Sequence, residues 1–88
     1  MNEINELRRR IDKIDSGILK LLEERWAITN SIGRIKRRKG VEYYDPDREE
    51  EIIRKLTSKT KLNRTFVEKT FKSIIRHCRK DETKESKR

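Results

Sequence analysis

The first 39 residues carry a long, regular pattern of apolar positions. Nine of ten positions spaced alternately by three and four hold Ile or Leu, and the tenth holds Arg25; the nine are Ile4, Leu7, Ile11, Ile14, Ile18, Leu21, Ile28, Ile32 and Ile35. This is the a/d repeat of a helix that packs along another helix. It predicts one helix over residues 3–39, roughly 55 Å long at about 1.5 Å per residue. Gly40 is expected to end it.

A second, shorter helix is predicted after a short connector. Asp45 suits the N-cap, Pro46 suits the first helical position, and acidic residues fill the first turn, where they complement the helix dipole. The apolar positions Ile52, Ile53 and Leu56 follow at helical spacing. We expect this helix to end near Lys59.

A third helix is predicted after Asn63, which also suits an N-cap. Its apolar positions are Phe66, Val67, Phe71, Ile74, Ile75 and Cys78. No hydrophobic residue follows Cys78, so we expect the helix to end within one or two further turns. The pattern predicts an all-α fold, with one helical domain over residues 1–82 and a charged, disordered tail over 83–88.

The long first helix is too long for so small a chain to cover. The protein has 88 residues and 31% hydrophobic content, which gives a single chain a marginal core. A second copy lying antiparallel along the stripe would cover it most economically. We therefore expect a homodimer.

Charge narrows the classes of ligand. Charged residues make up 47% of the chain, which excludes a membrane span, and 25 basic against 16 acidic residues give a net charge of +9. Such a surface favours anionic partners, either nucleic acid or small polycarboxylates and phosphates. One cysteine and one histidine exclude a disulfide framework and a Cys/His zinc site. The charged N-terminus lacks the apolar core of a secretory signal, so we expect a cytoplasmic protein.

Arg25 interrupts the apolar stripe. A guanidinium there costs several kcal/mol unless a carboxylate or an anionic ligand meets it, and the spacing leaves both possibilities open. Lys36 lies close to the same helix face, about 16 Å further along. Arg8 is about 25 Å from Arg25, too far for both to hold one compact ligand within a chain. An antiparallel partner would bring its own Arg8 close to Arg25.

Four runs combine charges, spacing and helix caps in a specific order: Leu7–Asp15, Leu21–Arg25, Ile35–Lys36 and Asp45–Glu49. Together they resemble the all-helical class of chorismate mutase, over about residues 4–82. The resemblance implies an intertwined homodimer of three-helix chains. It implies an isomerase of aromatic amino acid biosynthesis that rearranges chorismate to prephenate. That reaction needs neither a nucleophile nor a metal, so no cofactor is expected.

The resemblance also implies residue roles on the first helix. Arg25 and Arg8 of the partner subunit would bind the two carboxylates of chorismate. Lys36 would hold a carboxylate and donate to the ether oxygen, whose negative charge grows as the bond breaks.

Further roles are implied for the second and third helices. Arg48 would support the anion-binding network, while Glu49 and the backbone at Asp45 would receive the ring hydroxyl. Cys78 stands where the family often has a small polar residue. Glu82 stands where many members have a glutamine that hydrogen-bonds the ether oxygen, and a carboxyl group can donate there only when protonated.

Two alternatives remain open. An isochorismate-pyruvate lyase shares the fold, although Glu49 together with residues 45–48 matches the mutase pattern better. A basic helical dimer could instead bind nucleic acid through residues 34–39, five of which are basic, and through the charged tail. Nucleic acid is the less expected partner, because the spaced charges, connector length and helix caps together match the mutase pattern.

Overall fold

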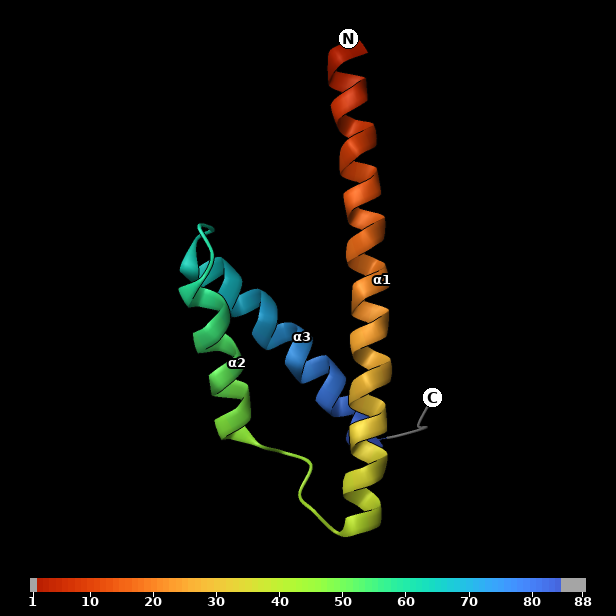
Figure 1. Ribbon diagram of the computed structural model, residues 1–88, viewed down its shortest axis with the longest axis vertical. Helices are drawn as coiled ribbons and strands as arrows, with labels where there is room; N and C mark the ends of the chain where they lie inside the picture. The colour runs from red at the N-terminus through yellow and green to blue at the C-terminus, as the bar shows by residue number, and fades with distance from the viewer. Residues whose placement is uncertain (1, 85–88) are drawn as a thin grey trace.

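The computed structural model describes the backbone of residues 2–84 and the side chains of residues 2–79, and it contains three helices (Figure 1). They are α1 (Asn2–Lys39), α2 (Pro46–Ser58) and α3 (Arg64–Lys84). The predicted all-α fold is confirmed, and the bounds agree closely with those expected. The side chain of Glu82 and the tail residues 85–88 lie outside the described residues.

The end of α1 is closed by Gly40. Its φ of 69° is left-handed, a conformation that glycine adopts without a Cβ clash. The Gly40 N–H donates to the Arg37 carbonyl at 3.3 Å, and the Val41 N–H donates to the Lys36 carbonyl at 2.8 Å. This pair of bonds satisfies two carbonyls at the helix end and turns the chain back. The predicted stop at Gly40 is confirmed.

The two shorter helices begin at the predicted caps. Asp45 Oδ1 accepts a hydrogen bond from the Arg48 N–H at 3.1 Å, and Pro46 is the first residue of α2. Asn63 Oδ1 accepts from the Phe66 N–H at 2.9 Å. Each cap satisfies a backbone donor that has no partner within its helix.

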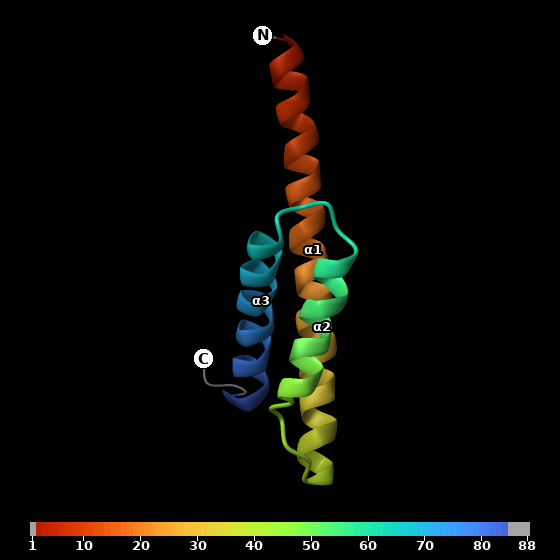
Figure 2. The ribbon, with the colours of Figure 1, turned by 90° about the vertical axis from the view of Figure 1, so that its left-hand side faces the viewer.

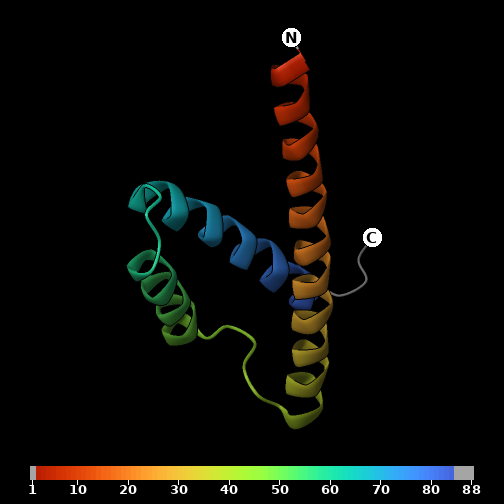
Figure 3. The ribbon, with the colours of Figure 1, turned by 45° about the horizontal axis from the view of Figure 1, so that its top comes forward.

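Helix α3 holds the three helices together. It packs against both α1 and α2, which diverge from one another on either side of it (Figures 1 and 3). The buried core of the described residues is correspondingly small and lies on α3, where Val67 is 6%, Ile75 7% and Cys78 4% exposed. Because α3 crosses α1 near Cys78, its apolar face approaches the segment of α1 that follows Arg25.

Much of α1 is not covered by the described part of the chain. Its N-terminal part extends beyond the other two helices (Figures 1 and 2), and the longest dimension of the molecule is 57 Å. All nine aliphatic residues of the a/d stripe are between 42% and 65% exposed. An exposed apolar stripe of this length, interrupted only at Arg25, is characteristic of an interaction surface. No described helix combines the length and apolar character needed to cross a bilayer.

Candidate active site

A cavity of about 150 Å³ lies where the three helices and the α1–α2 connector meet. Helix α1 contributes four residues that share one face at a spacing of about one helical turn: Arg25, Thr29, Ile32 and Lys36. The connector contributes Tyr43 and Asp45. Helices α2 and α3 contribute Arg48, Glu49, Ile52, Ile75, Cys78 and Arg79.

Most of the predicted site residues therefore share one cavity: Arg25, Lys36, Asp45, Arg48, Glu49 and Cys78. Arg8 does not join them in this chain, because it lies exposed on the projecting part of α1. The Glu82 side chain is outside the described residues, although α3 extends past this position.

Lys36 is held in place at the end of α1. Its Nζ donates to the Tyr43 carbonyl at 3.0 Å in a partly buried hydrogen bond, while its own carbonyl accepts the bond from Val41. The connector is therefore hydrogen-bonded to both the side chain and the backbone carbonyl of Lys36. An ammonium has three donors, so two remain for a ligand in the cavity.

Arg25 is half-buried, and no carboxylate among the described residues pairs with it. Lys36 is hydrogen-bonded to a neutral carbonyl. Two positive charges therefore line one cavity, and neither forms an ion pair with a carboxylate in the described part of the chain. Of the two possibilities that the spacing left open for Arg25, this arrangement favours an anionic ligand.

The other charged residues of the cavity already have partners. Asp45 caps α2 through Oδ1, and Arg48 Nη1 lies 3.1 Å from Glu51 Oε1. Glu49 Oε2 lies 2.9 Å from Arg79 Nε, in an ion pair that connects α2 to α3. Glu49 is therefore oriented by a cation on the neighbouring helix.

Sequence reasoning missed three polar residues of this site. Tyr43 acts through its backbone carbonyl, which no sequence pattern marks. Thr29 follows Arg25 by one helical turn, a spacing that could have identified it. Arg79 fell within the stretch interpreted as a charged helix end, yet it lies one turn after the buried Ile75 and therefore shares its face.

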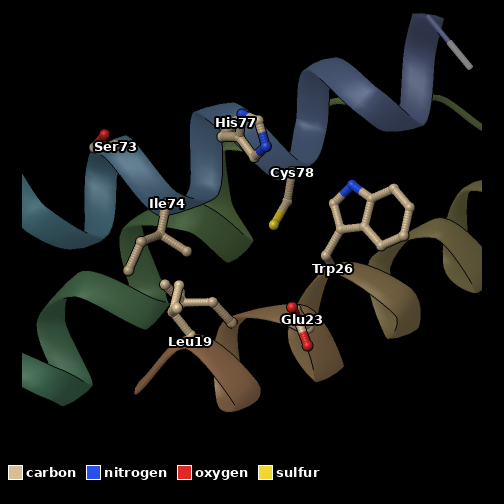
Figure 4. A pocket seen from close by; sticks show the side chains of 8 residues that line it. Leu19, Glu23, Trp26, Ser73, Ile74, His77 and Cys78 are labelled. Atoms are coloured by element: carbon tan, nitrogen blue, oxygen red, sulfur yellow. The ribbon is translucent and has the colours of Figure 1, made fainter. Parts of the chain in front are cut away.

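A second, larger groove of about 660 Å³ lies between α1 and α3 (Figure 4). Cys78 also lines this groove, together with Leu19, Leu22, Glu23, Trp26, Ser73, Ile74 and His77. Among the residues whose side chains are described, its lining contains no lysine or arginine. The smaller cavity is therefore the better candidate for an anionic ligand.

Comparison with known sequences identifies a family for the chain. Residues 7–83 match the family described as chorismate mutase type II. The chain is 35% identical over 80 residues to the chorismate mutase of Methanocaldococcus jannaschii, an overlap that covers 88% of this chain and 81% of that protein. It is 45% identical over 56 residues to the bifunctional chorismate mutase/prephenate dehydratase of Aquifex aeolicus, covering 64% of this chain and 16% of that protein.

Comparison with solved structures gives the same result. Form II of the chorismate mutase from Thermus thermophilus superimposes with a TM-score of 0.90 at 33% identity, covering 94% of this chain and 97% of that one. Form I of the same enzyme gives a TM-score of 0.83 at 35% identity, covering 86% and 98%. Sequence and fold agree over nearly the whole length, and the chain therefore belongs to the chorismate mutase type II family.

Proposed function

We propose that two copies of this chain rearrange chorismate to prephenate at the cavity built around Arg25 and Lys36. The observation that carries this proposal is the pair of cations that line one cavity, neither of which forms an ion pair with a carboxylate of the described residues. Chorismate is a dianion with an ether oxygen between its reacting parts, so it suits a site with fixed, spaced positive charges.

Lys36 is the residue proposed to stabilise the transition state. The breaking C–O bond places negative charge on the ether oxygen, and a cation already held nearby stabilises that charge more than it stabilises the ground state. The hydrogen bond from Nζ to the Tyr43 carbonyl keeps the ammonium in position before the substrate arrives. Little reorganisation is then needed during the reaction.

Binding of both carboxylates is proposed to select the reactive conformer. Arg25 and Arg8 of the partner subunit would each hold one carboxylate, so that the two reacting ends of the substrate approach each other. Glu49 and the backbone at Asp45 would receive the ring hydroxyl, and Arg48 would support the positive charge around the carboxylates. Cys78, which is 4% exposed, would form part of the wall.

The need for a second copy is supported by two features of the single chain. The exposed a/d stripe leaves a long apolar face on the same helix that carries Arg8 and Arg25. The cavity of about 150 Å³ is also smaller than the roughly 300–1,000 Å³ of typical ligand sites. We propose that an antiparallel α1 of the partner covers the stripe and completes the site with Arg8 of the partner subunit.

The decisive experiment is to follow the ultraviolet absorbance of chorismate with purified protein and to identify the product. We expect prephenate, with turnover that weakens only modestly when salt is raised. Activity on isochorismate alone would instead support the lyase alternative. Tight binding of nucleic acid that falls steeply with salt, without turnover of chorismate, would support the nucleic-acid alternative. The family match favours neither alternative.

The proposed role of Glu82 predicts that activity depends on pH. In the proposed site its protonated carboxyl group donates to the ether oxygen, whereas an ionised carboxylate would oppose the developing negative charge. We expect kcat/KM to fall as pH rises through the titration of Glu82. We expect Glu82→Gln to remove this dependence and to increase activity near neutrality, because an amide donates at any pH. An unchanged pH profile in both Glu82→Gln and a chain lacking residues 82–88 would contradict the assignment.

A further inference from the structure

We infer that Arg79 is a positioning residue that holds the Glu49 carboxylate for the ring hydroxyl of the substrate. The inference rests on the proposed function, which places Glu49 opposite that hydroxyl. Arg79 belongs to α3 and Glu49 to α2, so their contact fixes a side chain of one helix from another.

The Arg79–Glu49 ion pair differs from the surface pairs of the molecule. Its Nε–Oε2 distance is 2.9 Å, and its side chains are only 32% and 24% exposed. The pairs Glu6–Arg9, Arg48–Glu51 and Glu68–Lys72 each lie within one helix, with side chains between 37% and 67% exposed. Exposed pairs of that kind contribute little because water screens them. The Arg79–Glu49 pair is better shielded and lies in the wall of the cavity.

Tyr44 restrains the guanidinium from its flat side. The guanidinium carbon of Arg79 lies 4.5 Å from the centroid of the Tyr44 ring. Stacking on an aromatic face restricts the plane of an arginine in a way that a lysine cannot reproduce. The Glu49 carboxylate is consequently held by a cation that is itself held by the connector.

This arrangement leaves one oxygen of the Glu49 carboxylate for the substrate. An ionised carboxylate can accept hydrogen bonds at both oxygens. Oε2 of Glu49 lies against the Arg79 guanidinium in the ion pair. The second oxygen, Oε1, remains to accept the substrate hydroxyl. Without Arg79 the Glu49 side chain regains its rotational freedom, and the hydroxyl loses an oriented acceptor in the ground state and in the transition state alike.

We expect Arg79→Met to lower kcat/KM for chorismate by about 10- to 100-fold, mainly through a higher KM. This is the size of effect expected when a hydrogen bond to a charged group is lost, and a contact equally strong in both states acts on KM rather than on kcat. Glu49→Gln should have a similar effect. The double variant should lose little more than either single variant, because both substitutions remove the same interaction.

Two further variants separate positioning from folding. Arg79→Lys keeps the charge but not the planar stacking, so it should recover only part of the loss. Arg76→Met removes an exposed arginine from the same helix and should keep the KM of the unmodified protein. Circular dichroism and thermal unfolding of each variant establish whether that variant is folded. If Arg79→Met does not fold, Tyr44→Phe should keep the KM and Tyr44→Leu should raise it.

The outcomes distinguish this inference from the proposed function. Failure of the unmodified protein to convert chorismate would overturn both. Conversion with an unchanged KM in Arg79→Met would overturn the inference alone. Fully additive losses in the Arg79→Met, Glu49→Gln double variant would do the same, because Arg79 would then act independently of Glu49. If Arg79→Met does not fold and the Tyr44 variants are tested instead, an unchanged KM in Tyr44→Leu would also overturn the inference.

Discussion

Lys36→Ala is expected to lower kcat for chorismate by about 100- to 1,000-fold, with a smaller effect on KM. Loss of one preorganised donor to a developing oxyanion typically has this magnitude. The effect falls on kcat because the charge on the ether oxygen is largest in the transition state. Initial rates of chorismate consumption, measured over a range of concentrations, separate the two parameters.

The matched control for this experiment is Lys39→Ala. Lys39 belongs to the same basic run and is exposed at the end of α1, so its removal changes the net charge equally without touching the cavity. We expect its kcat to remain unchanged. If both variants lost activity equally, the general positive field of this segment would explain the result. If neither did, Lys36 would have no part in the rearrangement.

The helices could be predicted because their signals are local. The a/d repeat of α1 lies within one unbroken segment of the sequence. The left-handed Gly40 and the caps Asp45 and Asn63 depend on residues within one or two turns. Each predicts a boundary without knowledge of the rest of the chain. The same spacing placed Arg25 and Lys36 close to one face of α1, where the structure finds them lining one cavity.

The parts of the site that escaped prediction depend on how α3 crosses the other helices. Arg79 lies in a run of charged residues, so its sequence context is that of a solvated helix end. Only the packing of α3 against α2 brings Arg79 Nε to Glu49. Only the path of the connector places the Tyr44 ring against the Arg79 guanidinium. The carbonyl of Tyr43 escaped for a different reason, since every residue has one and only the fold selects which carbonyl meets Lys36.

Mixing two inactive chains is expected to restore activity. Arg8→Ala and Arg25→Ala should each inactivate the homodimer, since each of its sites then lacks one of the two proposed carboxylate-binding arginines. In a mixed dimer, one site combines Arg25 of the first chain with Arg8 of the second, and the other site lacks both. Random exchange of equal amounts makes half of the dimers mixed, so about a quarter of the original activity should return. The measurement is the rate of chorismate consumption before and after the two chains are unfolded together and refolded.

The outcome of this mixing depends on which chain Arg8 serves. If Arg8 acted on its own chain's site, every site in the mixture would still lack one arginine, and no activity would return. That arrangement already conflicts with the separation of about 25 Å between Arg8 and Arg25 along one helix. Sedimentation must show that the refolded species is a dimer, and Arg10→Ala, which removes a neighbouring exposed arginine, should remain active by itself. Dimers that exchange without recovering activity would contradict the assignment of Arg8 to the partner's site. An active Arg8→Ala homodimer would place Arg8 outside the site and leave the exposed stripe of α1 with a purely structural role.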